Sequence, residues 1–298
     1  MTNGRFGPRH ASARVSFEYF PPRDVVAERA LVTCAHAMRR FAPAFQTVTF
    51  GADGGESEST THWAVTLDQL TEVPTAAHVT LCAFDTPDAF LAHVDALREA
   101  GIARLVVLRG DAVGRGNGLA GFTSVAEAVA AIGSRHRFDI SVAAYPETHP
   151  KAESAETDLD ALMAKFDAGA ARALTQFFFN NDDFLRLRDR LARRRPNATL
   201  VPGVMPVASF ARVARFAERC GARVPDAMRE RFEAASGDRS IASDVARDAI
   251  CEQVRSLAGE GVRDLHVYTM NRVDLAADAA RAFQAARPQD SESVSAVA

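Results

Sequence analysis

Short β-rich segments alternate with longer helical segments along nearly the whole chain. The segments predicted as strands cover residues 14–19, 46–50, 77–83, 104–108, 139–144, 172–178, 199–204 and 264–268. Helical patterns lie between them, for example over residues 24–41, 87–100, 153–168 and 209–219. Several of these helices begin after Asp, Ser or Thr, and several are followed by glycine, as helix ends require. Strands that are separated by helices in this way are expected to pair in parallel.

Eight such strands in a chain of 298 residues predict an α/β fold, namely a (β/α)8 TIM barrel. An open doubly wound sheet is the alternative. Residues 225–259 are too many for one helix and predict an extra helix before the last strand. No linker-like stretch divides the interior. We therefore expect one domain over residues 14–287, between flexible tails at residues 1–13 and 288–298.

Composition excludes some classes of function. The 35 basic and 38 acidic residues give a net charge of −3, which argues against general nucleic-acid binding. No apolar run approaches the roughly 18 residues of a membrane span. The four cysteines lack the spacing of a zinc or redox motif. We expect no metal site, and buried thiols in a reducing, cytoplasmic compartment.

One carboxylate stands out in the stretch VSFEYFPPR. Chemistry in such a barrel sits where strands end, and Pro21 and Pro22 place Glu18 near the end of the first strand. Alternation directs Phe17 and Tyr19 to one face and Glu18 to the other, toward the barrel mouth. Apolar surroundings would raise the Glu18 pKa and let it hold a proton at neutral pH. A paired, structural carboxylate is the alternative.

Other predicted strand ends carry polar residues that suit a bound ligand. Each also has a plain structural interpretation, such as a turn, an exposed ion pair or a solvated side chain. Tyr145 could stack on a planar ligand, and Gln176 is an amide that needs partners inside an apolar strand. The strand-end stretches are TVTFGADGGES, LVVLRGD, VAAYPETHP, ALTQFFFN, LVPGVMP and LHVYTMNR.

Seven of these stretches, in this order, resemble the landmarks of the methylenetetrahydrofolate reductase family in its short bacterial form. They are SFEYFPP, VTFGA, LRGD, AAYPETHP, DAGAARALTQFFF, PGVMPV and YTMNR, and the resemblance runs from about residue 15 to residue 287. It implies a barrel that binds FAD and forms homo-oligomers. It also implies a ping-pong reaction in which NADH or NADPH reduces the flavin, and the flavin reduces 5,10-methylenetetrahydrofolate to 5-methyltetrahydrofolate.

The resemblance also implies roles for individual residues. Glu18 matches the catalytic acid that protonates N10 of the folate, and Asp111 matches a catalytic aspartate beside the flavin. Thr49 would lie near both the flavin and the nicotinamide. The further substrate-binding residues would be Gln176, Phe216 and Arg272. The cofactor-binding residues would be Thr49, Phe50, Ala52, His78, Arg109, Gly110, Asp111, Tyr145, His149, Ala152, Asp158 and Lys165.

The chain departs from the family pattern in a few places. Phe50 stands where a tyrosine is common, and AHVTLCAFDTP is one residue longer than usual, which leaves the register of His78 open. The loop of residues 112–122 lacks the usual proline-rich character. Two other functions also remain open: a flavin- or folate-binding protein without turnover, and a flavoenzyme of the same fold that acts on another substrate.

Overall fold

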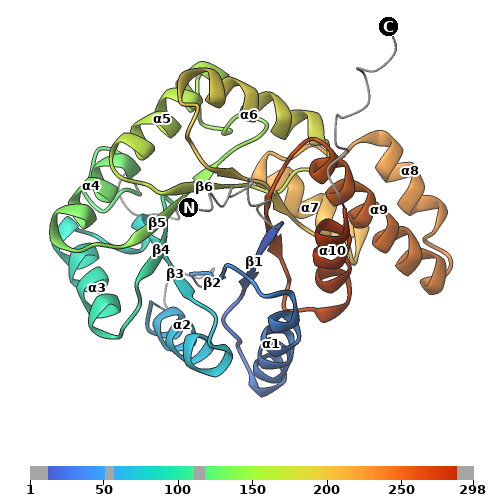
Figure 1. Ribbon diagram of the computed structural model, residues 1–298, viewed down its shortest axis with the longest axis horizontal. Coiled ribbons are helices and arrows are strands. Elements are labelled where there is room, and N and C mark those ends of the chain that lie inside the picture. Colours follow the sequence, from blue (N-terminus) through green and yellow to red (C-terminus); the bar gives the residue numbers. More distant parts are fainter. Residues whose placement is uncertain (1–12, 51–56, 111–117, 287–298) are drawn as a thin grey trace, which may run out of the picture.

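A single parallel sheet forms the centre of the computed structural model, which describes residues 13–50, 57–110 and 118–286 (Figure 1). The predicted tails, apart from Ala13, lie outside the described residues. The strands run in the spatial order β7-β6-β5-β4-β3-β2-β1-β9-β8. Their bounds are β1 (Arg14–Tyr19), β2 (Phe45–Val48), β3 (Thr75–Thr80), β4 (Arg104–Leu108), β5 (Asp139–Ala144), β6 (Arg172–Thr175), β7 (Leu200–Val201), β8 (Gly203–Val204) and β9 (Asp264–Tyr268).

The barrel closes across Pro202, which divides the predicted strand 199–204 into β7 and β8. The proline has no N–H to donate, so the ladder is interrupted there. Before it, β7 pairs with β6, and after it β8 pairs with β9. The Pro202 carbonyl still accepts a hydrogen bond from the His266 N–H at 2.9 Å. The two short strands thus occupy one barrel position, and the predicted (β/α)8 barrel is confirmed.

Helices surround the sheet, as Figure 1 shows. The extra helix before the last strand is confirmed, because α8 and α9 both lie between β8 and β9. The predicted helix over residues 24–41 ends in the short 3-10 segment η1 (Arg39–Phe41). The other bounds are α1 (Val25–Met38), α2 (Ser57–Thr71), η2 (Leu81–Ala83), α3 (Pro87–Glu99), α4 (Val125–Arg135), α5 (Ala155–Asp167), α6 (Asn181–Arg194), α7 (Phe210–Cys220), α8 (Asp226–Ala234), α9 (Arg239–Gly259) and α10 (Val273–Ala285).

The two faces of the strands bury different kinds of side chain. Phe17 and Tyr19 are fully buried with residues of the surrounding helices, and the Phe17 ring lies 6.3 Å from that of Phe41. Alternation therefore turns both rings outward, as predicted. Inside the barrel, a smaller apolar cluster is formed by Phe45, Ala76, Val106, Leu174 and Val201. These residues support the polar groups that lie nearer the carboxyl ends of the strands.

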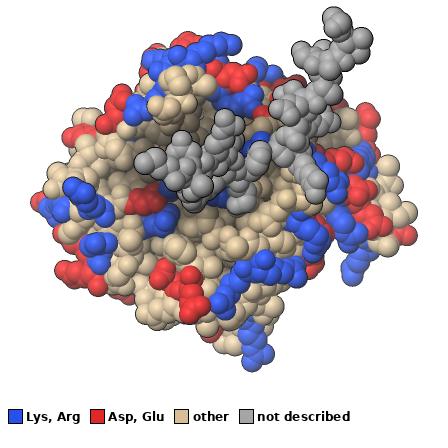
Figure 2. Space-filling model, viewed as in Figure 1, with Lys and Arg blue, Asp and Glu red and all other residues tan. Residues whose placement is uncertain are grey.

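Charged side chains are mixed in sign on the surface. On the face shown in Figure 2, basic and acidic residues are interspersed around the periphery of the barrel. This agrees with the small net charge of −3. Among the described residues, no helix is both long enough and apolar enough to cross a membrane. All four cysteines are free, with Cys34 and Cys251 buried.

The amino-terminal ends of the strands carry a paired charge network. Asp139, at the start of β5, accepts hydrogen bonds from Arg104 of β4 at 2.5 Å and from Arg172 of β6 at 3.0 Å. Both guanidinium groups also lie over the Phe45 ring, at 5.8 and 5.2 Å from its centroid. A cavity of about 330 Å³ opens beside these residues. Because the charges satisfy one another at the end opposite the strand exits, we assign them to stability.

We predict that Asp139→Asn lowers the free energy of unfolding by about 1–3 kcal/mol, since two half-buried guanidinium groups lose their shared carboxylate. Urea denaturation measures this change. The matched control is Asp160→Asn, which breaks the exposed Arg194–Asp160 pair and should cost about 0–1 kcal/mol. Equal losses in the two variants would show that burial does not strengthen the network.

Candidate active site

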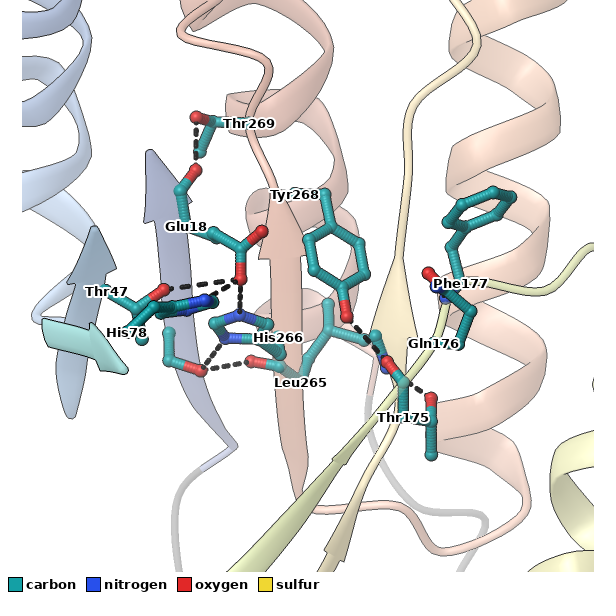
Figure 3. Close-up of polar contacts among 12 residues, drawn as sticks. Glu18, Thr47, His78, Thr175, Gln176, Phe177, Leu265, His266, Tyr268 and Thr269 are labelled. Carbon is teal, nitrogen blue, oxygen red and sulfur yellow. Dashed lines mark hydrogen bonds and ion pairs between the residues drawn. The ribbon is translucent and has the colours of Figure 1, made fainter. Parts of the chain in front are cut away.

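Glu18 lies inside the barrel at the carboxyl end of β1, and its carboxylate is surrounded by polar groups (Figure 3). Its Oε2 atom lies 3.3 Å from Nε2 of His78 on β3 and 3.4 Å from Nε2 of His266 on β9. The Thr47 hydroxyl of β2 donates to the same oxygen at 3.4 Å. Strand register brings these four side chains together, because β1 pairs with β2 and β9, and β2 pairs with β3.

The ionisation state of Glu18 differs from the state that we predicted from its sequence. Burial alone would raise its pKa, but the charge of His78 and the hydrogen bonds from His266 and His78 outweigh burial and lower the pKa to about 2. The expectation of a proton-holding carboxyl in apolar surroundings is therefore wrong for the protein without ligands. The reason is the alternation itself: Phe17 and Tyr19 face outward, so the neighbours of Glu18 are interior polar side chains.

His266 is a member of this network that our sequence analysis missed. It is fully buried, and its Nδ1 lies 2.8 Å from the Ser16 hydroxyl. The hydroxyl also donates to the Leu265 carbonyl at 3.3 Å. Ser16, His266 and Glu18 thus form a continuous hydrogen-bonded chain, of which Figure 3 shows the contact between His266 and Glu18. Side chains alternate between the two faces of a strand, so His266 must share a face with Tyr268 in the LHVY stretch. This alternation is the sequence signal from which His266 could have been predicted.

The strand exits around Glu18 are fixed by side chains of the YTMNR stretch. The Thr269 hydroxyl donates to the Glu18 carbonyl at 2.6 Å. Asn271 binds both backbone groups of Phe20, at 3.0 and 2.9 Å. The Tyr268 hydroxyl donates to the Thr175 carbonyl at 2.6 Å, beside Gly203. A Cβ atom on Gly203 would lie only 2.7 Å from that hydroxyl, so this contact requires glycine.

Several predicted cofactor-binding residues meet at the exit of β5. The rings of Tyr145 and His149 are in edge contact, with their centroids 4.5 Å apart. The Asp158 carboxylate accepts from the His149 N–H at 2.9 Å, and the Ala152 N–H donates to the His149 carbonyl at 2.8 Å. The Lys165 ammonium donates to the Ala143 carbonyl at 2.9 Å. A small cavity of about 10 Å³ lies among Tyr145, Asp158 and Lys165.

The titratable groups at this exit have altered proton affinities. Burial, opposed by Asp158 and aided by Lys165 and Arg109, lowers the His149 pKa. Its Nδ1 accepts the Lys151 N–H at 3.0 Å, so the neutral ring carries its hydrogen on Nε2. Burial also lowers the Lys165 pKa, although Asp158 opposes this shift. A neutral imidazole that can donate a hydrogen bond therefore lies close enough to Lys165 for the two groups to influence each other.

The remaining described cofactor candidates lie at the exits of β2, β3 and β4. Thr49 is buried, and its carbonyl accepts from the Thr60 hydroxyl at 3.0 Å. Phe50 contacts the rings of Phe84 and His93. Gly110 has φ +81°, and a Cβ there would lie 2.5 Å from Cys82 Sγ, so the turn after Arg109 requires glycine. His78 lies inside the barrel, where it contacts Glu18, and the AHVTLCAFDTP stretch continues after β3 into η2.

The predicted substrate residues lie on the other side of the mouth. Gln176 follows β6, and its Oε1 accepts from the Phe177 N–H at 3.0 Å. Phe216 of α7 stacks on Phe177, with centroids 5.3 Å apart, and is 40% exposed. Arg272 precedes α10 and lies 3.6 Å from Asp274. Asp111 and Ala52 lie outside the described residues. The ligand-binding roles of all these residues remain predictions.

The sequence matches the family model described as methylenetetrahydrofolate reductase over residues 6–282. It is 38% identical to the 5,10-methylenetetrahydrofolate reductase of Pectobacterium carotovorum subsp. carotovorum, over 88% of this chain and 87% of that protein. Identity to the enzyme of Escherichia coli K12 is 37% at the same coverage.

Among solved structures, an uncharacterized protein from Clostridium thermocellum that binds two copies of 5-methyl-5,6,7,8-tetrahydrofolic acid has the same fold. Its TM-score is 0.62 at 14% identity, and the match covers 92% of this chain and 94% of that one. The match of the family model over most of the sequence, together with the two bacterial relatives, shows that this chain belongs to the methylenetetrahydrofolate reductase family.

Proposed function

We propose that this protein reduces 5,10-methylenetetrahydrofolate to 5-methyltetrahydrofolate in a ping-pong reaction that uses FAD and NADH or NADPH. The observation that carries the proposal is the buried carboxylate of Glu18, held by two imidazoles at the carboxyl end of the barrel in a chain of this family. We further propose that the protein acts in the cytoplasm as a homo-oligomer, as the family resemblance implies.

The residues at the exits of β2 to β5 fit a flavin dinucleotide. Arg109 and Lys165 supply positive charge for its phosphates, the neutral His149 supplies an N–H donor, and Tyr145 supplies a ring edge and face. Thr49, Phe50, His78 and Gly110 would line the ring system, with Ala152 and Asp158 holding the His149 loop. When bound, FAD would supply the two-electron chemistry that accepts a hydride from the nicotinamide and passes it to the folate.

Glu18 would supply the proton that opens the five-membered ring of the folate. Breaking the bond to N10 requires a proton on that nitrogen, and a carboxyl group inside the mouth can provide it. With a pKa of about 2, however, the resting carboxylate carries no proton of its own at neutral pH. We propose that the proton reaches Glu18 through its contacts with His78 and His266 as N10 takes one. Ser16 would keep His266 oriented during this transfer.

The opposite side of the mouth would orient the substrate. The Gln176 amide can hydrogen-bond a pterin or a nicotinamide amide, because both present matching donors and acceptors. The exposed face of Phe216 offers a stacking surface for either planar ring. Thr49 would contact the nicotinamide, and Arg272, which is largely exposed, would contact the folate. A shared set of residues that binds the two substrates in turn would suit ping-pong kinetics.

The experiment that tests this function follows flavin absorbance under anaerobic conditions. The purified protein should contain FAD, NADH or NADPH should bleach it, and methylenetetrahydrofolate should then restore the colour. Bound flavin that neither nicotinamide reduces would support a binding protein without turnover. Reduction without reoxidation by the folate would point to a flavoenzyme that acts on another substrate.

We predict that Glu18→Gln leaves the reduction of FAD by NAD(P)H nearly intact but slows reoxidation by the folate by at least about 100-fold, the scale of general acid catalysis. Stopped-flow absorbance measures each half-reaction separately. Thr47→Val is the control, since it removes the 3.4 Å hydrogen bond to Glu18 but leaves the carboxyl group. Equal loss of both half-reactions in Glu18→Gln would remove Glu18 from the acid role.

We also predict that Glu18 makes folding stability depend on pH in acid. Its pKa is 4.5 ordinarily and about 2 in the folded protein, so ionised Glu18 stabilises the fold above pH 4.5. This contribution, roughly 3 kcal/mol by linkage, disappears as the pH falls from about 4.5 to 2. Urea denaturation across this range should show a steeper loss in the wild type than in Glu18→Gln. Parallel curves for the two proteins would contradict the lowered pKa.

A further inference from the structure

The loop that follows β5 has a second face, turned toward α7 rather than toward the proposed flavin residues. Glu147 lies in this loop, two residues after Tyr145 and two before His149. Both of its carboxylate oxygens accept the backbone N–H of Arg223, at 2.9 and 3.0 Å. Its side chain is only 9% exposed. The Glu147 carboxylate of the proposed cofactor loop is therefore hydrogen-bonded to the backbone of a residue 76 positions later in the sequence.

Arg223 joins this carboxylate to a second one. Its Nη2 donates to Asp183 Oδ1 at 2.9 Å, and its Nε lies 3.4 Å from Glu147 Oε1. Asp183 belongs to the first turn of α6, and its side chain is only 3% exposed. Burial is the largest reason that the Glu147 pKa is raised, and the charge of Asp183 adds to it. One guanidinium group thus holds together two carboxylates that would otherwise repel each other.

Arg223 lies three residues after the carboxyl end of α7 at Cys220. Gly221 ends this helix with φ +74°, and the Ala222 N–H returns to the Ala217 carbonyl at 2.9 Å. A Cβ on Gly221 would lie 2.7 Å from Pro150 Cγ, so the helix end also packs directly against the loop after β5. The contact of Arg223 with Glu147 and the packing of Gly221 against Pro150 therefore both hold the carboxyl end of α7 against the loop after β5. We call this contact region the junction between α7 and the loop.

Phe216 lies on α7, one turn and a half before that junction. Its ring stacks on Phe177, which follows Gln176, and the residue is 40% exposed. We propose that Arg223 is a positioning residue: by tying α7 to Glu147 and Asp183, it sets where the exposed face of Phe216 lies relative to the proposed flavin loop. This proposal rests on the proposed function only for its kinetic readout.

The test is a double-mutant cycle between Arg223→Met and Phe216→Leu. In the wild-type background, Arg223→Met should raise the KM for both the folate and the nicotinamide roughly tenfold, because a small displacement of a binding surface is costly. In the Phe216→Leu background it should raise neither KM further. Arg223→Lys keeps the positive charge but lacks the planar guanidinium group that can contact two carboxylates. It should therefore raise the two KM values less than Arg223→Met does.

Arg186→Met is the matched control. Arg186 also pairs with Asp183 and is 60% exposed, but it belongs to α6, so its pair with Asp183 lies within that helix. Its loss should leave both KM values unchanged. Additive effects of Arg223→Met and Phe216→Leu, or an equal effect of Arg186→Met, would overturn the positioning role.

Hydrogen–deuterium exchange gives a readout that needs no turnover. Amides of residues 210–220 should exchange faster in Arg223→Met than in the wild type, while those of α1 and α10 should not change. Unchanged exchange in α7 would overturn the proposal even in an active enzyme. Faster exchange in a protein without folate activity would support the junction and refute the proposed function separately.

Discussion

The site depends on one physical constraint, which is that a carboxylate inside a barrel must be neutralised by partners. Glu18 meets this constraint through His78 and His266, which lie on different strands. A buried charge without such partners would cost several kcal/mol or take up a proton. The pair of imidazoles therefore explains both how the charge is tolerated and why its pKa falls rather than rises. If Glu18 acts as the proposed acid, its proton has to reach it from outside the resting carboxylate.

The construction of the barrel determines that these partners meet. Three parallel pairings, β9 with β1, β1 with β2 and β2 with β3, bring Glu18, Thr47, His78 and His266 to neighbouring positions. The apolar cluster that contains Phe45 closes the interior beneath them, and the Phe45 ring stacks on His266 with centroids 6.0 Å apart. Because Glu18 and His266 are both buried, the electrostatic attraction between carboxylate and imidazole is stronger than it would be in water.

Much of the fold was predictable because it depends on local alternation. The strands, the extra helix and the outward direction of Phe17 and Tyr19 follow from patterns within a few residues. The division of strand 199–204 at Pro202 was not predicted, although the proline was visible, because it depends on which neighbour each half pairs with. The direction of the Glu18 pKa shift failed for a related reason: His78 and His266 lie 60 and 248 residues away in the sequence, and only the closed barrel makes them neighbours.

The two halves of the site differ in how firmly they are held. The groups proposed for proton transfer lie on paired strands, where backbone ladders fix their separation. The stacking ring of Phe216 lies on a helix whose end is tied down by Arg223, a side chain that is 71% exposed. The carboxylates that it contacts, Glu147 and Asp183, are only 9% and 3% exposed, so the tie is stronger than an ion pair between two exposed groups, yet it depends on one side chain. Such an arrangement would suit the proposed function, in which two different planar rings bind in turn beside one carboxyl group.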